Sequence, residues 1–102
     1  MKNKENYYYK RLCVEATDTS YPNDWGTCTY YFKANTEGGV EKQLQVFENG
    51  RSLRYSVLYP KDNYGQLTAM PLNLTEFEPF KITEHEFLKT LLYHNLKKMT
   101  IR

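Results

Sequence analysis

The sequence contains 102 residues, of which 40% are hydrophobic and 25% charged, a balance typical of one globular domain rather than of a disordered chain. Its 14 basic and 12 acidic residues leave a formal net charge of +2, which predicts no strong long-range attraction to nucleic acid or to anionic lipid. We expect a single domain over residues 7–102, preceded by a disordered tail at residues 1–6.

Polar residues begin the chain, and no apolar run has the length of a signal-peptide core or a membrane span. We therefore expect a cytoplasmic protein without membrane contact. Disulfides are rare in the cytoplasm, so Cys13 and Cys28 are expected to be reduced thiols packed in the interior. They would bridge only if adjacent strands brought them together. Because the two cysteines lack CxxC spacing, no zinc site is predicted.

The first half of the chain alternates strand-like and turn-like segments. Residues 7–16, YYYKRLCVEA, are rich in aromatic and β-branched side chains and predict a strand. Residues 17–27 collect Asp, Thr, Ser, Pro, Asn and Gly and predict a loop. Residues 28–34 alternate in polarity and predict a second strand, which a turn at residues 35–39 closes.

The hairpin around Asn49-Gly50 is the most specific local signal. Asn-Gly is the best sequence for a two-residue type I′ turn, so residues 40–48 and 51–59 are predicted as its two strands. Counting outward from this turn places two apolar pairs on one face: Val46 with Leu53, and Leu44 with Tyr55. We expect this face to be mainly apolar and the reverse face to be mainly polar.

The second half predicts less regular chain followed by a helix. Residues 66–70 are expected to form a short edge strand. After Pro71 we expect either irregular chain or one short strand at residues 80–82. Thr83-Glu84-His85-Glu86 fits a capping box, and a helix is predicted over residues 84–98. Its apolar residues recur on one side of a 3.6-residue repeat: Phe87, Leu88, Leu91, Leu92, Leu96 and Met99. The predicted fold class is α+β, an antiparallel sheet of about four to five strands with one C-terminal helix packed on its apolar face.

The sequence argues against nucleotide binding, metal binding and catalysis. It contains no glycine-rich phosphate loop. His85 and His94 lie nine residues apart on one predicted helix, so they cannot ligate one metal together or serve a nucleophile elsewhere. Acidic pairs such as Glu76 with Glu78 are interpreted as solubilising. We therefore expect a non-enzymatic protein with no catalytic residues, no metal and no cofactor.

Binding is the remaining class of function. Two loops concentrate the side chains that dominate protein interfaces. The candidate protein-binding residues are Tyr21, Asp24, Trp25, Tyr59, Lys61, Asp62 and Tyr64. The alternative interpretation is that Trp25 folds back over the edge of the core, in which case it would stabilise the fold and contact no partner.

A single-stranded RNA-binding face is the alternative from a different class. Aromatic rings interleaved with basic residues stack bases in many RNA-binding sheets. The candidates for such a face are Tyr7, Tyr9, Arg11, Tyr31 and Lys33. The strands carry no RNP-type glycine-aromatic motif, so nucleic acid is possible but not favoured.

Three short motifs carry a resemblance: VFENG at residues 46–50, Leu67-Thr68, and ITEHEF at residues 82–87. They resemble a widespread family of small uncharacterised bacterial domains, in which a VF-x-(N/D)-G hairpin precedes a terminal I-(S/T)-x-x-E-F helix. The Tyr-rich start and the loop around Trp25 depart from that family. The resemblance implies no catalytic residues, and the domains are similar in scale to immunity proteins of bacterial toxin systems.

The function expected on these grounds is a protein-binding module, an immunity-type inhibitor that occludes a bacterial toxin or another effector protein. A phage-encoded inhibitor of a host defence protein is a further alternative, which would bind a different target protein through the same kinds of contact. Either would act as a monomer or a homodimer.

Overall fold

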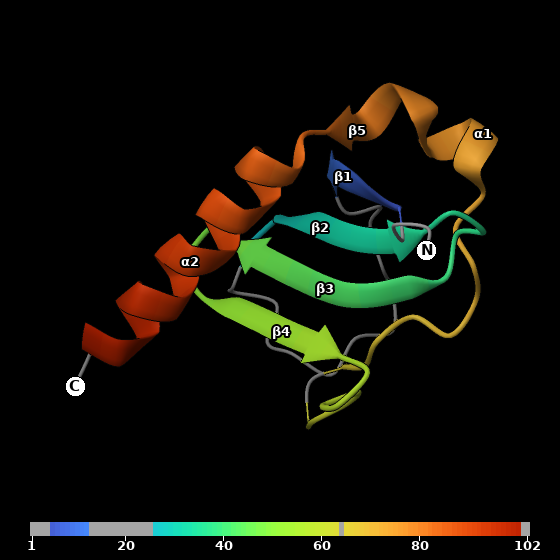
Figure 1. Cartoon of the computed structure of the whole chain (residues 1–102). Coiled ribbons are helices and arrows are strands. Elements are labelled where there is room, and N and C mark those ends of the chain that lie inside the picture. The colour runs from blue at the N-terminus through green and yellow to red at the C-terminus, as the bar shows by residue number, and fades with distance from the viewer. Residues whose placement is uncertain (1–4, 13–25, 64, 101–102) are drawn as a thin grey trace.

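The computed structural model describes residues 5–12, 26–63 and 65–100, with the backbone alone for residues 95–100. Five antiparallel strands form one sheet in the order β4-β3-β2-β1-β5. The elements are β1 (Asn6–Leu12), β2 (Cys28–Asn35), β3 (Val40–Phe47), β4 (Ser52–Ser56), α1 (Leu74–Phe77), the 3-10 turn η2 (Glu78–Phe80), β5 (Lys81–Ile82) and α2 (Glu84–Thr100). Figure 1 shows α2 running obliquely past the ends of β2, β3 and β4, with its last turns projecting beyond the sheet. The predicted α+β class and C-terminal helix are confirmed.

The β3–β4 hairpin is offset by one residue from the predicted pairing. Val46 pairs with Ser52, where Leu53 was expected. Since neighbouring residues of a strand point to opposite faces, Leu53 and Tyr55 lie on the face opposite to Leu44 and Val46. The predicted apolar and polar faces of this hairpin are therefore wrong.

The offset arises in the loop that joins β3 to β4. This loop holds three residues, Glu48, Asn49 and Gly50, because the N–H of Phe47 donates to the carbonyl of Arg51 at 2.8 Å. Of the three, Gly50 alone has a positive φ, of +93°. A type I′ turn needs positive φ at two central residues, whereas a three-residue loop needs it only at the last.

Each face of the sheet is covered over part of its area, by different parts of the chain. We call the first the loop face; it carries Tyr9, Cys28, Phe32, Ala34, Gln43, Phe47, Leu53 and Tyr55. Leu67, Leu72, Leu74 and Phe77 of the segment 66–80 pack onto it. We call the second the helix face; it carries Tyr8, Lys10, Tyr31, Lys33, Lys42, Leu44, Val46 and Arg54. Leu44 is buried on the helix face, and Leu53 and Tyr55 are buried on the loop face. Because each face buries apolar side chains of the hairpin, burial does not favour one hairpin register over the other.

Gln43 anchors the covering segment to the loop face. Its side chain is buried, where an unpaired amide would cost roughly 1–3 kcal/mol. Its Nε2 donates to the carbonyl of Gln66 at 3.2 Å, and its Oε1 accepts from the N–H of Thr68 at 2.9 Å. These two bonds satisfy backbone groups that would otherwise pair in a sheet. Residues 66–70, predicted as an edge strand, form only the isolated bridge between Gln66 and Lys61.

Helix α2 begins as predicted, but over residues 84–94, whose side chains the structure describes, it buries a narrower stripe. The N–H of Glu86 donates to Thr83 Oγ1 at 3.0 Å, so the N-terminal cap is confirmed. Phe87 is fully buried, and its ring lies 5.2 Å from that of Tyr8 between centroids. Leu88 and Leu92, predicted to pack inward, are exposed. The predicted six-residue stripe is therefore wrong at these two positions, because the helix rests on the sheet along a line through Phe87.

One short helix was not predicted. In α1, Asn73 caps the first turn, its Oδ1 accepting from the N–H of Glu76 at 3.0 Å. The helix buries Phe77, which contacts the rings of Tyr9 and Phe32 on the loop face. The short strand expected at residues 80–82 is present as β5 and pairs with β1.

Cys28 is disulfide-bonded, so the prediction of a reduced thiol at this position is wrong. The one other cysteine of the sequence, Cys13, lies outside the described residues. Within the described residues, neither helix has the length and hydropathy that crossing a membrane requires.

Candidate protein-binding site

The predicted protein-binding residues fall partly within the described chain. Tyr59, Lys61 and Asp62 lie on the connection that follows β4. Tyr21, Asp24, Trp25 and Tyr64 lie outside the described residues, so their predicted role stays a prediction.

Three consecutive apolar residues open this connection. Tyr59 was among the predicted candidates, whereas Val57 and Leu58 were not, because they looked like the end of a strand. Val57 is 68% exposed, Leu58 82% and Tyr59 74%. Single exposed apolar residues are common on protein surfaces, whereas a contiguous group is a marker of interaction sites. We call residues 57–62 the binding turn.

Backbone hydrogen bonds fix the shape of the binding turn. The N–H of Ser56 donates to the carbonyl of Tyr59 and the N–H of Tyr59 donates to that of Ser56, both at 3.1 Å. Ser56 Oγ also accepts from the N–H of Tyr59 at 3.3 Å. The apolar side chains of Val57 and Leu58 thus project from a closed turn, so binding would order little additional backbone.

Asp62 ties the far end of the binding turn to the core. Its Oδ1 accepts from the hydroxyl of Tyr55 at 2.8 Å and from the N–H of Gly65 at 3.2 Å. Burial raises the pKa of Tyr55 well above its ordinary value, and the hydrogen bond to the Asp62 carboxylate raises it further. Asp62, predicted to contact a partner, therefore acts in the described chain as an anchor.

This anchor predicts a loss of stability at high pH. A tyrosine whose folded-state pKa is raised contributes stability that is complete below its unfolded value of about 10 and is lost as the pH rises through the folded value. The pKa values of Tyr8 and Tyr9 are raised too, chiefly by burial. We expect the free energy of unfolding to fall steadily above about pH 10, measured by urea denaturation. In Tyr55→Phe this fall should be shallower, and stability at neutral pH should drop by about 1.5–3 kcal/mol. An equal slope in both proteins would contradict the assignment.

The predicted RNA-binding residues are not brought together. Tyr7, Tyr9 and Arg11 point to the loop face, whereas Tyr31 and Lys33 point to the helix face. Tyr9 is buried in the core and offers no ring for a base to stack on. The five residues therefore do not form a single RNA-binding surface.

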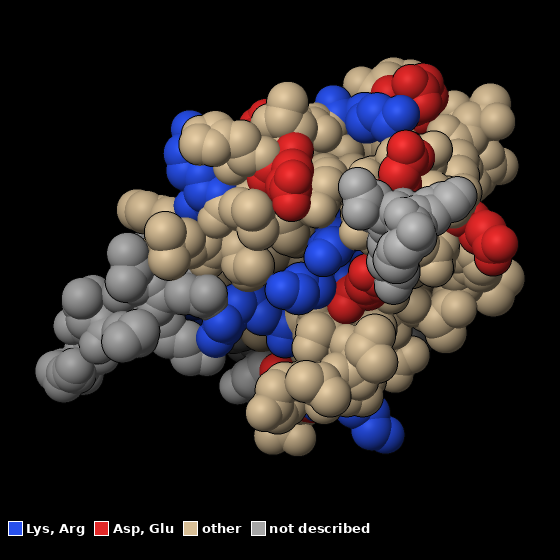
Figure 2. All heavy atoms as spheres, viewed as in Figure 1, with Lys and Arg blue, Asp and Glu red and all other residues tan. Residues whose placement is uncertain are grey.

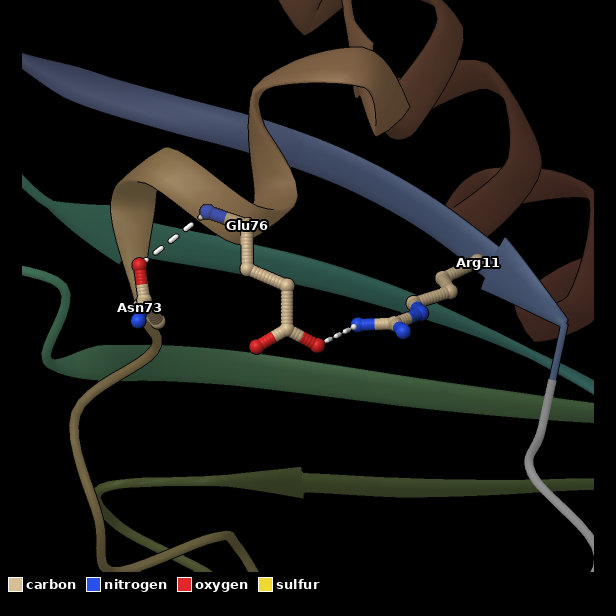
Figure 3. Close-up of polar contacts among 3 residues, drawn as sticks. All are labelled: Arg11, Asn73 and Glu76. Carbon is tan, nitrogen blue, oxygen red and sulfur yellow. Dashed lines mark hydrogen bonds and ion pairs between the residues drawn. The ribbon is translucent and has the colours of Figure 1, made fainter.

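Arg11 serves the fold rather than a ligand. Figure 3 shows its guanidinium reaching the carboxylate of Glu76, the same residue whose N–H is capped by Asn73. The ion pair measures 2.8 Å. The guanidinium also lies 4.8 Å from the ring centroids of Phe77 and of Phe80. These contacts attach α1 and η2 to strand β1.

Comparison of the chain with protein-family models, with curated proteins and with solved structures returned no match. Among the described residues, no group of three or more His, Cys, Asp or Glu side chains is placed to hold a metal ion.

Proposed function

We propose that this protein is a non-enzymatic protein-binding module that contacts its partner through the binding turn. The observation that carries the proposal is the exposed apolar run Val57, Leu58 and Tyr59 on a turn closed by its own hydrogen bonds. Burying such side chains against another protein contributes most of the affinity of a typical interface. Lys61, exposed on the same turn, suits the polar rim of such an interface.

Within this class, we propose an immunity-type inhibitor that occludes a toxin or another effector protein. Small size and a rigid projecting turn support this proposal, because a preordered turn inserts into a concave surface at low entropic cost. A phage-encoded inhibitor of a host defence protein would use the same surface on a different target.

The cytoplasmic location stays a prediction. The disulfide of Cys28 weighs against it, since disulfides persist mainly in oxidising compartments.

The proposal predicts that Leu58→Asp strongly weakens binding of the partner, whereas the same change outside the binding turn does not. A partner that copurifies in stoichiometric amount with the wild-type protein should bind the variant at least about thirty-fold more weakly by calorimetry, the loss expected of an interface hot spot. Leu88→Asp places the same charge on exposed α2 and should bind as the wild type does. Equal binding of both variants, with both folded by circular dichroism, would rule out the binding turn as the contact surface.

A further inference from the structure

Four basic side chains gather on the helix face although they are far apart in the sequence. Each of four adjacent strands supplies one of them: Lys10, Lys33, Lys42 and Arg54. We call this group the basic band. Figure 2 shows lysine and arginine side chains in a continuous run across the middle of this side of the molecule, beside α2. Lys10, Lys42 and Arg54 are exposed, and Lys33 is half-buried.

The register places like charges next to each other within the band. Lys33 pairs directly with Lys42 across β2 and β3. Opposed like charges in a sheet lower its stability, so the fold does not require this arrangement. Glu41, which precedes Lys42, accepts a hydrogen bond from Asn6 Nδ2 at 3.3 Å. Within the described chain, no carboxylate forms an ion pair with Lys33 or Lys42.

The spacing of the charges in the band suits an extended polyanion. Adjacent strands lie about 4.8 Å apart and diagonal neighbours about 7–8 Å apart, so four strands present a row of separated charges rather than one pocket. Tyr31 lies within the row, with Lys10 Nζ 5.8 Å from the centroid of its ring. Because Tyr31 is half-buried and Tyr8 buried, the face offers charge more than open rings.

We propose that the basic band binds the phosphate backbone of single-stranded nucleic acid without reading its sequence. The proposal is independent of the binding turn. Contacts of lysine and arginine to phosphates supply affinity but carry no base information, and the limited exposure of the rings leaves little base stacking. The overall charge of +2 predicted no such attraction, because it also counts the acidic side chains. One of them, Glu84, lies near the band, where its Oε2 accepts from the hydroxyl of Tyr8 at 3.3 Å.

The test uses a fluorescent oligouridylate of about 20 nucleotides and measures anisotropy between about 50 and 200 mM salt. Four phosphate contacts predict a slope of about −2.8 in the plot of log affinity against log salt. In Lys33→Gln/Lys42→Gln the slope should shrink by about 1.4, and the affinity at the lowest salt should fall about tenfold or more.

The matched control is Lys89→Gln/Arg51→Gln, which removes the same charge from exposed positions outside the band. It should retain the wild-type slope. The proposal is overturned if the wild type does not bind the oligonucleotide, or if the control loses as much affinity as the band variant. It is equally overturned if poly-L-glutamate of matched charge binds as tightly, since the band would then fit an acidic protein. Circular dichroism of each variant excludes unfolding as the cause.

Discussion

Phe87→Ala should lower the free energy of unfolding by about 3–5 kcal/mol, the range measured for removing a buried aromatic ring. Phe87 is fully buried and provides the ring contact through which α2 meets Tyr8 on the helix face. The loss is a large part of the roughly 5–15 kcal/mol that stabilises a domain of this kind. Urea denaturation followed by far-ultraviolet circular dichroism measures it.

Leu88→Ala provides the comparison for this variant, because Leu88 adjoins Phe87 but is exposed. Its stability should change by no more than about 0.5 kcal/mol. Equal losses in the two variants would mean that α2 packs on the sheet through a different face.

Gly38→Ala should lower the free energy of unfolding by about 2–4 kcal/mol. Gly38 has a φ of +94°, which side chains rarely adopt, and a Cβ atom there would overlap with the carbonyl oxygen of Leu72. The carbonyl of Gly38 accepts from the N–H of Leu72 at 2.8 Å. The substitution would therefore push the covering segment 66–80 away from the loop face. Thermal and urea denaturation both report the loss.

Gly39→Ala is the matched substitution one residue later. Gly39 lacks the positive φ, and a Cβ atom there would meet the side-chain amide of Asn35, the closest atom at 3.0 Å. A side chain adjusts more easily than a backbone carbonyl, so the cost should be about 1 kcal/mol or less. If both variants were equally stable, Gly38 would not be the point at which the segment is held.

The sequence predicted the elements better than their arrangement. Alternation and capping signals located four strands and the C-terminal helix, because these depend on residues close together in the chain. The hairpin register was wrong because Asn49-Gly50 suits both a two-residue and a three-residue loop, and burial on both faces removed the second constraint. The way in which segment 66–80 covers the loop face was not predicted, because Gln43, which holds the segment, lies more than 20 residues away.

For the candidate sites too, the sequence predicted what depends on neighbouring residues and missed what depends on strand pairing. Tyr59 and Lys61 were predicted from composition, and their role stays a prediction. The role of Asp62 could not be predicted, because it depends on Tyr55, which the incorrect register placed on the opposite face of the sheet. The basic band was not predicted as a group, because its four residues meet only through the pairing of four strands. Local patterns do not encode such long-range register.

Site-specific photocrosslinking from the binding turn tests the central claim most directly. A photoreactive phenylalanine analogue at Leu58 should crosslink one protein species in stoichiometric yield when the protein is bound to its partner, while the same group at Leu88 on α2 should give no such product. Both positions are exposed, so accessibility alone does not distinguish them. Crosslinking from Leu88 in place of Leu58 would show that the partner lies on α2 and that the binding turn is not the site.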